Sequence, residues 1–136
     1  MRRIRMVGAV ATMVLATARC GGDSTGISSI NGPWTLRTVN GAPLPYTMSG
    51  GSGGTTELVE DVLTLNVGGT WSETKRVRTS AGGQITTETR NSAGSYSTFG
   101  TSITFTAATG GASRLATFAD DALTFVETGA TSVYRQ

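Results

Sequence analysis

The chain has 136 residues, of which 15% are charged, and it carries a formal net charge of +2 with no histidine and one cysteine. This composition excludes a Ser-His-Asp or Cys-His catalytic centre, a histidine-containing zinc site and a cysteine-cluster metal site. Four of the eleven basic residues precede Cys20, which leaves seven Lys and Arg against nine Asp and Glu. The positive charge therefore belongs to the N-terminal segment, and it does not predict binding to nucleic acid.

Residues 1–19 have the three zones of an export signal. Three arginines lie within the first five residues, an apolar run covers residues 6–16, and a short segment then leads to Cys20. The apolar run is about half of the ~20 residues that a membrane-spanning helix needs. We therefore predict a signal peptide over residues 1–19 rather than a transmembrane helix.

The segment that follows allows two processing routes. Cys20-Gly21-Gly22-Asp23-Ser24 resembles the start of a bacterial lipoprotein, in which the cysteine is lipidated and a flexible tether follows, here residues 20–31. Ala16-Thr17-Ala18 fits the small-x-small rule for ordinary signal cleavage, which would leave a soluble N-terminus. We predict lipidation at Cys20, because it accounts for an unpaired thiol in an oxidising compartment, and keep cleavage after Ala18 as the alternative.

The first predicted strand covers residues 33–39. Its segment Trp34-Thr35-Leu36-Arg37 alternates apolar and polar residues, which is the period of a strand with one buried face. Asn40-Gly41 follows and predicts a hairpin turn, because both residues tolerate positive φ. The two prolines of residues 42–48 allow only an edge segment or an extended crossover there. The glycine-rich residues 49–55 are predicted to form a flexible loop.

A long extended region over residues 56–67 carries apolar residues on both faces early and on one face later. Val59, Asp61, Leu63 and Leu65 share one parity, whereas Leu58 has the other. This change predicts a β-bulge near Glu60-Asp61 that switches the buried face. Further strands are predicted over residues 70–79, 84–90, 95–99, 102–106, 114–118, 122–127 and 131–135.

Eight or nine short strands joined by tight turns predict an all-β domain over residues 32–136. No part of this range shows the 3.6-residue apolar period of an amphipathic helix. A single antiparallel up-and-down β-barrel of about eight strands is favoured over a sandwich, because consecutive hairpins need few long crossovers and closure removes exposed strand edges.

Several short motifs of this range also carry a family resemblance. They are Gly32-Pro33-Trp34-Thr35-Leu36, Asn40-Gly41, Leu63-Thr64-Leu65, Gly69-Thr70-Trp71, Gly94-Ser95-Tyr96, Ile103-Thr104-Phe105, Asp121-Ala122-Leu123-Thr124-Phe125 and Val133-Tyr134-Arg135. Together they resemble the lipocalin-like, calycin-type domains of small bacterial envelope lipoproteins. The opening Trp-x-Leu followed by Asn-Gly is also similar to META-type heat-shock lipoprotein domains. The lipocalin-like resemblance implies a small calycin-type barrel and brings no catalytic residues with it.

The strand over residues 70–79 carries the most informative candidates for a site. If Trp71 and Val77 point into the barrel, the two-residue period turns Glu73 and Lys75 inward as well. A buried unpaired charge is costly, so these two side chains should pair or lie in a wet cavity.

The neighbouring strand offers Ile85, Thr87 and Thr89 on its predicted inner face, and these side chains are mostly small and polar. They would leave space for a ligand, with Trp71 and Tyr96 as an aromatic floor. The predicted ligand-binding residues are therefore Trp71, Glu73, Lys75 and Tyr96. The alternative is a hairpin that extends beyond the core, with both charged residues in solvent.

Other candidate motifs favour structural roles. The carboxylates form no catalytic motif, and Asp120-Asp121 is typical of a turn. Gly50-Gly51-Ser52-Gly53-Gly54 lacks the lysine and the helix of a phosphate-binding loop. Lys75-Arg76-Val77-Arg78 is typical of a solvated or ion-paired strand. We predict no enzymatic activity, no cofactor and no metal site.

The sequence thus predicts an exported envelope lipoprotein that faces the periplasm, with a soluble periplasmic or secreted form as the alternative. Its barrel is predicted to bind an apolar or amphipathic small molecule. The alternative function is a structural or interaction lipoprotein with a filled barrel that contacts another envelope component. The oligomeric state is left open, with a monomer as the default.

Overall fold

A computed structural model describes residues 30–136, and the regular structure within them is entirely β-strand. The strands are β1 (Gly32–Val39), β2 (Ala42–Pro43), β3 (Tyr46–Gly51), β4 (Gly54–Asn66), β5 (Thr70–Ala81), β6 (Gln84–Phe99), β7 (Ser102–Ala107), β8 (Arg114–Ala119), β9 (Ala122–Glu127) and β10 (Ala130–Arg135). The predicted export signal and Cys20 lie outside the described residues. Within residues 30–136 no helix is long and apolar enough to cross a membrane.

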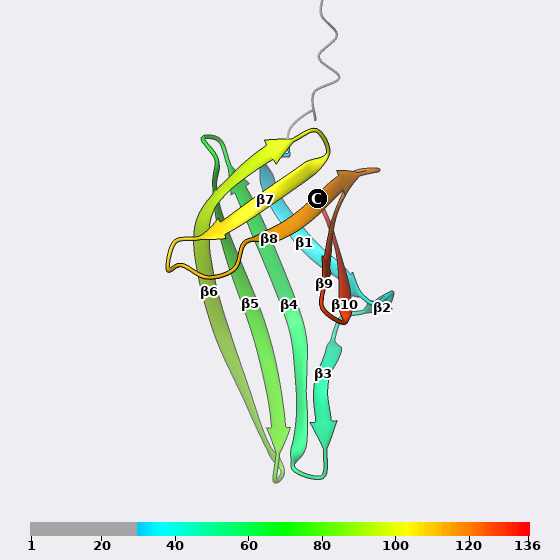
Figure 1. The fold of residues 1–136 in the computed structure, drawn as a ribbon. Coiled ribbons are helices and arrows are strands. Elements are labelled where there is room, and N and C mark those ends of the chain that lie inside the picture. Colours follow the sequence, from blue (N-terminus) through cyan, green and yellow to red (C-terminus); the bar gives the residue numbers. More distant parts are fainter. Residues whose placement is uncertain (1–29) are drawn as a thin grey trace, which may run out of the picture.

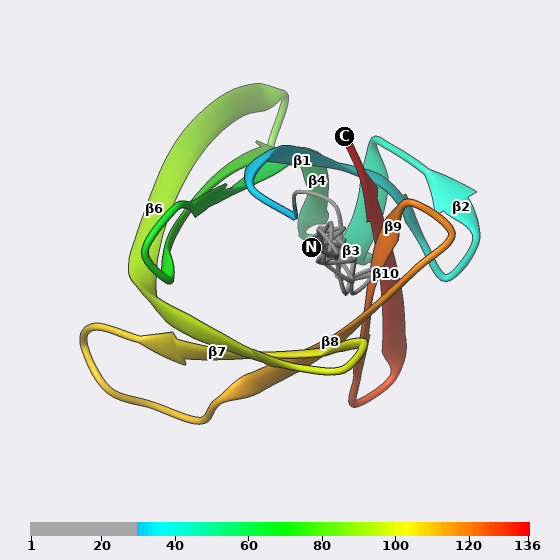
Figure 2. The same ribbon diagram turned by 90° about the horizontal axis from the view of Figure 1, so that it is seen from above.

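Eight strands close into an antiparallel barrel, as predicted. The chain runs from β4 to β10 by consecutive antiparallel pairings, and β1 pairs with both β10 and β4 to close the circle. Figure 2 shows the closed ring from above. The two remaining strands, β2 and β3, lie outside the ring as edge additions to β1 and β4. The architecture is consistent with a lipocalin-like barrel.

Two tight hairpins follow directly from the turn residues that the sequence supplies. Asn40 and Gly41 both adopt positive φ, 51° and 78°, between β1 and β2. Asp120 and Asp121 do the same, with φ of 51° and 55°, between β8 and β9. Left-handed residues at both central positions match the twist of the flanking strands. Both turn predictions are confirmed.

The predicted bulge in β4 is also confirmed. The register between β4 and β5 shifts between Leu58 and Glu60. Before the shift the buried side chain is Leu58, and after it Asp61, Leu63 and Leu65 are buried. One extra residue therefore turns the opposite parity inward, and this brings a carboxylate into the interior.

Two predictions about chain organisation are wrong. Residues 49–55 do not form a flexible loop, because β3 and β4 stay paired up to Gly51 and Gly54 around a short turn. A Cβ at Gly54 would lie within 2.2 Å of the Ser80 carbonyl oxygen, so glycine there permits close approach to the end of β5. Likewise, the predicted strands 84–90 and 95–99 are one strand, β6, since residues 91–94 remain paired with β5.

The barrel axis is filled by side chains. The largest fully buried ones are Trp34, Tyr134, Phe125, Leu63, Leu65, Ile103, Leu123 and Asp61. Phe105 and Phe125 lie 5.2 Å apart between ring centroids, and Phe125 and Tyr134 lie 5.4 Å apart. Burial of each such apolar side chain contributes about 1.5–3 kcal/mol to the stability of the folded state.

Part of the sheet extends beyond the barrel. The pairing of β6 with β7 begins only at Gly94, and every residue of 84–93 is exposed. In Figure 1 the lower ends of β3, β4, β5 and β6 project as one sheet, and β1 starts at the opposite end of the barrel, where Gly32 pairs with Leu65 near the end of β4. We call this part the projecting sheet; it comprises residues 46–51, 54–58, 77–81 and 84–93.

Candidate functional site

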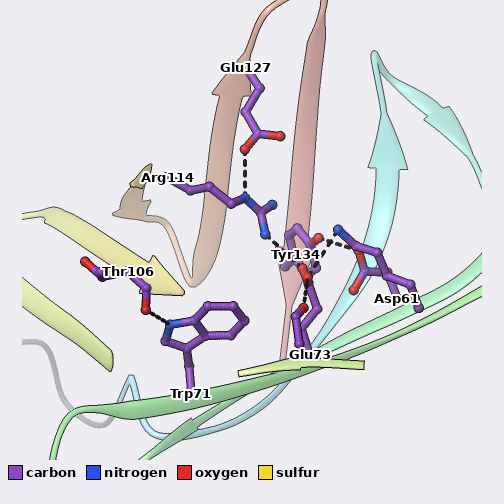
Figure 3. Close-up of polar contacts among 9 residues, drawn as sticks. Asp61, Trp71, Glu73, Thr106, Arg114, Glu127 and Tyr134 are labelled. Atoms are coloured by element: carbon purple, nitrogen blue, oxygen red, sulfur yellow. Dashed lines mark hydrogen bonds and ion pairs between the residues drawn. The ribbon is translucent and has the colours of Figure 1, made fainter. Parts of the chain in front are cut away.

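A group of charged side chains lies beside the aromatic core, and Figure 3 shows how its members meet. We call it the polar cluster; its members are Asp61 of β4, Glu73 and Lys75 of β5, Arg114 of β8 and Tyr134 of β10. The local structure of β4 and β5 explains why their three members point inward. The bulge turns Asp61 inward, and the period of β5 turns Glu73 and Lys75 toward the side that Trp71 occupies.

Ion pairs connect the charged members of the polar cluster. Lys75 Nζ lies 3.2 Å from Glu73 Oε2 and 3.5 Å from Asp61 Oδ2. Arg114 Nη1 donates to Glu73 Oε1 at 3.0 Å, and Arg114 Nε donates to Glu127 Oε1 at 2.7 Å. The guanidinium also lies 4.5 Å from the ring centroid of Phe125, a cation–π contact that covers the core. Glu73 thus has two cationic partners, although only 4% of it is exposed.

Hydroxyl groups complete most of the remaining hydrogen bonds. The Tyr134 hydroxyl donates to Asp61 Oδ2 at 2.7 Å, and the Ser92 hydroxyl donates to Glu73 Oε2 at 3.0 Å. Asp61 Oδ1 is the exception, since it is buried and no described group bonds to it. A buried carboxylate oxygen without a partner is costly, and Asp61 is therefore the strained member of the cluster.

The two buried carboxyl groups respond to this environment in opposite ways. Burial, reinforced by the negative charge of Glu73, raises the pKa of Asp61 to about 6. Burial also opposes ionisation of Glu73, but Lys75 and Arg114 outweigh it and hold the pKa of Glu73 below its usual value. Burial and the neighbouring Asp61 raise the pKa of the Tyr134 hydroxyl far above its usual value. Near neutral pH, Asp61 is therefore the member whose charge changes.

The members of the polar cluster bind mainly to one another. Its carboxylates pair with Lys75 and Arg114, and the hydroxyls of Tyr134 and the neighbouring Ser92 donate to those carboxylates. Among residues 30–136, no group of three or more His, Cys, Asp or Glu side chains could hold a metal ion. These ion pairs and hydrogen bonds cover one end of the core and join β4, β5, β8 and β10 to one another.

The four predicted ligand-binding residues divide into two groups. Glu73 and Lys75 pair, as expected for inward charges, and Lys75 remains about one-third exposed. Trp71 belongs to the core: its Nε1 contacts the backbone oxygens of Ser95 at 3.0 Å and Thr106 at 3.3 Å.

Tyr96 packs on the same core at the end from which β1 starts. The centroids of Trp71 and Tyr96 lie 6.0 Å and 6.2 Å from that of Phe105. The Tyr96 hydroxyl lies 2.8 Å from Asn31 Oδ1 and 3.0 Å from the Asn66 carbonyl, both acceptors for its one proton. The aromatic pair and the charged pair are thus parts of a packed interior.

The predicted inner face of the neighbouring strand is wrong. The register of β5 and β6 pairs Glu73 with Ser92, Lys75 with Arg90 and Val77 with Glu88. Directly paired residues point to the same side of a sheet. Ile85, Thr87 and Thr89 therefore lie on the outer face, and they line no space in the barrel. The alternative, a hairpin that extends beyond the core, is correct for residues 84–93 of β6 but not for Glu73, which is buried.

Sequence reasoning missed three members of the polar cluster. Asp61 shares its parity with Leu63 and Leu65, so a signal for its burial was present in the sequence. Arg114 opens β8 and Tyr134 nearly ends β10, and no local pattern indicates that they meet residues of β4 and β5. That contact follows from barrel closure.

One cleft lies beside β5, β6 and the turn after β7. It has a volume of about 450 Å³ and is open to solvent. We call it the outer cleft; it is lined by Ser72, Glu73, Thr74, Asn91, Ser92, Ala93, Ala108 and Thr109. Four of these residues, at positions 72, 74, 91 and 93, have the outward parity of β5 and β6. The turn after β7 forms its wall, where the Ala108 N–H donates to the Ala93 carbonyl at 2.9 Å.

Comparisons of the chain with models of protein families, with curated proteins and with solved structures found no match. The resemblance to lipocalin-like envelope lipoproteins, and the weaker one to META-type domains, therefore stay predictions.

Proposed function

We propose that this chain is an exported lipoprotein of the cell envelope, anchored through Cys20, and that its barrel is a non-catalytic interaction module. The observation that carries the proposal is the contrast between the two ends of the domain. The barrel axis is occupied by buried aromatic and aliphatic side chains, whereas residues 84–93 are exposed on both faces.

The filled axis favours interaction with a protein over binding of an apolar small molecule. A barrel that carries such a ligand needs an apolar cavity of several hundred cubic ångströms within its wall. Here Trp71, Phe105, Phe125 and Tyr134 form a continuous row of aromatic contacts across that position. The polar cluster closes the row on one side, and its side chains are largely committed to internal contacts.

The position at which β1 begins supports the same proposal. β1 starts at the end of the barrel opposite the projecting sheet (Figure 1). A lipid anchor on Cys20, which precedes β1 in the chain, would hold that end of the barrel toward a membrane and leave the projecting sheet toward the envelope space. This is the arrangement expected of a domain that presents a surface to another envelope component.

Site-specific photo-crosslinking in living cells tests the proposal. A photoreactive residue replaces Thr87, which is exposed on β6, and in a matched control replaces Val126, which is 74% exposed on β9 of the barrel. We expect protein adducts from position 87 and few from position 126. Equal adduct formation at both positions, or none at either, would contradict the proposal. Release of the protein into the soluble fraction by Cys20→Ser would support the anchor, and unchanged membrane association would refute it.

A further inference from the structure

We propose that the exposed edge of β6 binds the same edge of a second copy, in an antiparallel pair centred on Thr89. This inference rests on the proposed function, because it takes the projecting sheet as the contact surface, and it names the partner as the chain itself. It is carried by two features of β6: the free backbone groups of residues 84–92 and the order of charges at Glu88 and Arg90.

The edge of β6 offers a row of unpaired backbone groups. Residues 84–92 pair with β5 on one side only, since β7 and the turn after it bond to β6 from Ala93 onward. The Ala93 carbonyl points away from β5, because it accepts from Ala108. Backbone groups of a strand alternate in direction, so Ile85, Thr87, Thr89 and Asn91 also point their N–H and C=O groups toward the free edge. Such an edge is a template for strand addition.

The other free edge of the projecting sheet is less suited to pairing. The register of β3 and β4 shifts between Thr47 and Ser49, and β3 ends in Gly50 and Gly51. Irregularity of this kind disrupts a strand edge and discourages further pairing. By contrast, β6 pairs with β5 from Gln84 to Ser95 without a register shift, so its edge is regular.

The charges of β6 select one register for self-pairing. In an antiparallel pair centred on Thr89, Glu88 of each copy lies opposite Arg90 of the other. Centring the pair on Glu88 or on Arg90 would instead place identical charges opposite each other, which is unfavourable. Within one copy Arg90 Nη2 already donates to Glu88 Oε2 at 2.9 Å on the same face. The pair would thus join two such ion pairs into an alternating group of four charges.

The turn after β7 limits how far this pairing extends. With the centre at Thr89, position 85 of one copy would lie opposite Ala93 of the other, but the Ala108 N–H already donates to the Ala93 carbonyl on this edge. The pair therefore covers residues 87–91, with Thr87 of each copy opposite Asn91 of the other. Ile85, which is 68% exposed, lies beyond the paired segment.

The antiparallel arrangement fixes the overall form of the pair. Each barrel lies beyond the end of the shared strands, because β6 enters its own barrel at Gly94. The two β1 strands then begin at opposite ends of the assembly. The interaction is best measured without the anchor, on the full chain carrying Cys20→Ser, which also removes the only thiol.

Sedimentation velocity over a concentration series tests the pairing with charge reversal. We expect the Cys20→Ser chain to form a dimer, and Arg90→Glu to weaken it about tenfold or more, since Glu88 would then face Glu on the partner. The combined change Glu88→Arg and Arg90→Glu restores opposite charges across the dyad and should restore the dimer. A dimer unaffected by Arg90→Glu, or no rescue by the double change, would overturn the register.

A further variant separates the edge contact from folding. Thr89→Pro removes an N–H that points away from β5, so the monomer should keep its circular dichroism spectrum and lose the dimer. A dimer unaffected by Thr89→Pro would overturn the pairing through this edge.

A monomer at every concentration up to several hundred micromolar would overturn the inference. If position 87 still formed adducts with another protein in cells, the proposed interaction function would stand and only the self-pairing would fall. If position 87 formed no adducts either, both proposals would fall.

Discussion

Replacement of Asp61 by asparagine probes the strained member of the polar cluster. The side chain is 1% exposed, its Oδ2 accepts a hydrogen bond from Tyr134, and its Oδ1 has no partner among the described residues. Asparagine has nearly the same shape and resembles the protonated acid. The substitution removes the buried negative charge of Asp61. Burial and the neighbouring charge of Glu73 oppose that charge, and they raise the pKa of Asp61 to about 6.

The size of the effect follows from proton linkage. The pKa of Asp61 rises from 3.8 to about 6 on folding, so the folded state binds the proton more tightly than the unfolded state. This proton contributes stability that is fully present below pH 3.8 and is lost as the pH rises through 6. With about 1.4 kcal/mol for each pKa unit, the whole effect is about 3 kcal/mol. About 1.4 kcal/mol of it falls between pH 5 and pH 8.

Urea unfolding at several pH values between 5 and 8 is the appropriate assay. The unsubstituted chain should lose about 1.4 kcal/mol of unfolding free energy across this range, and Asp61→Asn should lose little. At pH 8 the variant should be more stable by about 1–3 kcal/mol. Glu73 does not mask this change, because its lowered pKa places its own loss of stability at more acidic pH.

Asp121→Asn is the matched control, since it changes the net charge equally at an exposed turn whose positive φ asparagine tolerates. Its stability relative to the unsubstituted chain should not depend on pH in this range. If Asp61→Asn kept the full pH dependence, or were the less stable protein at pH 8, the assignment of strain to Asp61 would be refuted.

Three further substitutions test the packing around the same core. Gly94→Ala should lower the free energy of unfolding by more than about 3 kcal/mol or prevent folding, because its Cβ would lie 1.9 Å from a backbone oxygen of β7. Its control is Gly53→Ala, which has open space around the Cβ and should be near neutral by thermal unfolding. Tyr134→Phe removes the hydrogen bond to Asp61 and should lower stability by about 1–3 kcal/mol and raise the pKa of Asp61, measured by NMR titration of the carboxyl carbon. Trp71→Ala should cost about 3–5 kcal/mol in urea unfolding, as expected of a buried aromatic side chain; a cost below 1 kcal/mol would contradict its place in the core.

The barrel could be predicted because its determinants are local. Alternation along residues 33–39, the paired turn residues Asn40-Gly41 and Asp120-Asp121, and the parity change at the bulge each act over a few residues. These signals specify the strands and the turns. When strands that follow one another in sequence pair antiparallel, only a few arrangements bury one face of every strand.

The composition of the polar cluster could not be predicted in the same way. Arg114 meets Glu73 only because β8 lies across the barrel from β5, a relation that no local spacing records. The inner face of β6 was mispredicted for a related reason. Which alternate residues of β6 point inward depends on its register with β5, and the turn at Gly82-Gly83 sets that register. A one-residue difference there exchanges Thr87 and Thr89 for Glu88 and Arg90 on the inner face.

The central claim is that the barrel is a filled module that acts through its surface, and native mass spectrometry tests this most directly. The full chain is expressed in a bacterial envelope and purified gently, alongside the Cys20→Ser chain, which lacks the anchor. The account predicts that Cys20→Ser has the mass of the polypeptide alone, as a monomer or a dimer, and that the parent chain differs from it only by the covalent lipid. A reproducible additional small molecule held by both proteins would contradict a filled barrel and would favour a ligand carrier.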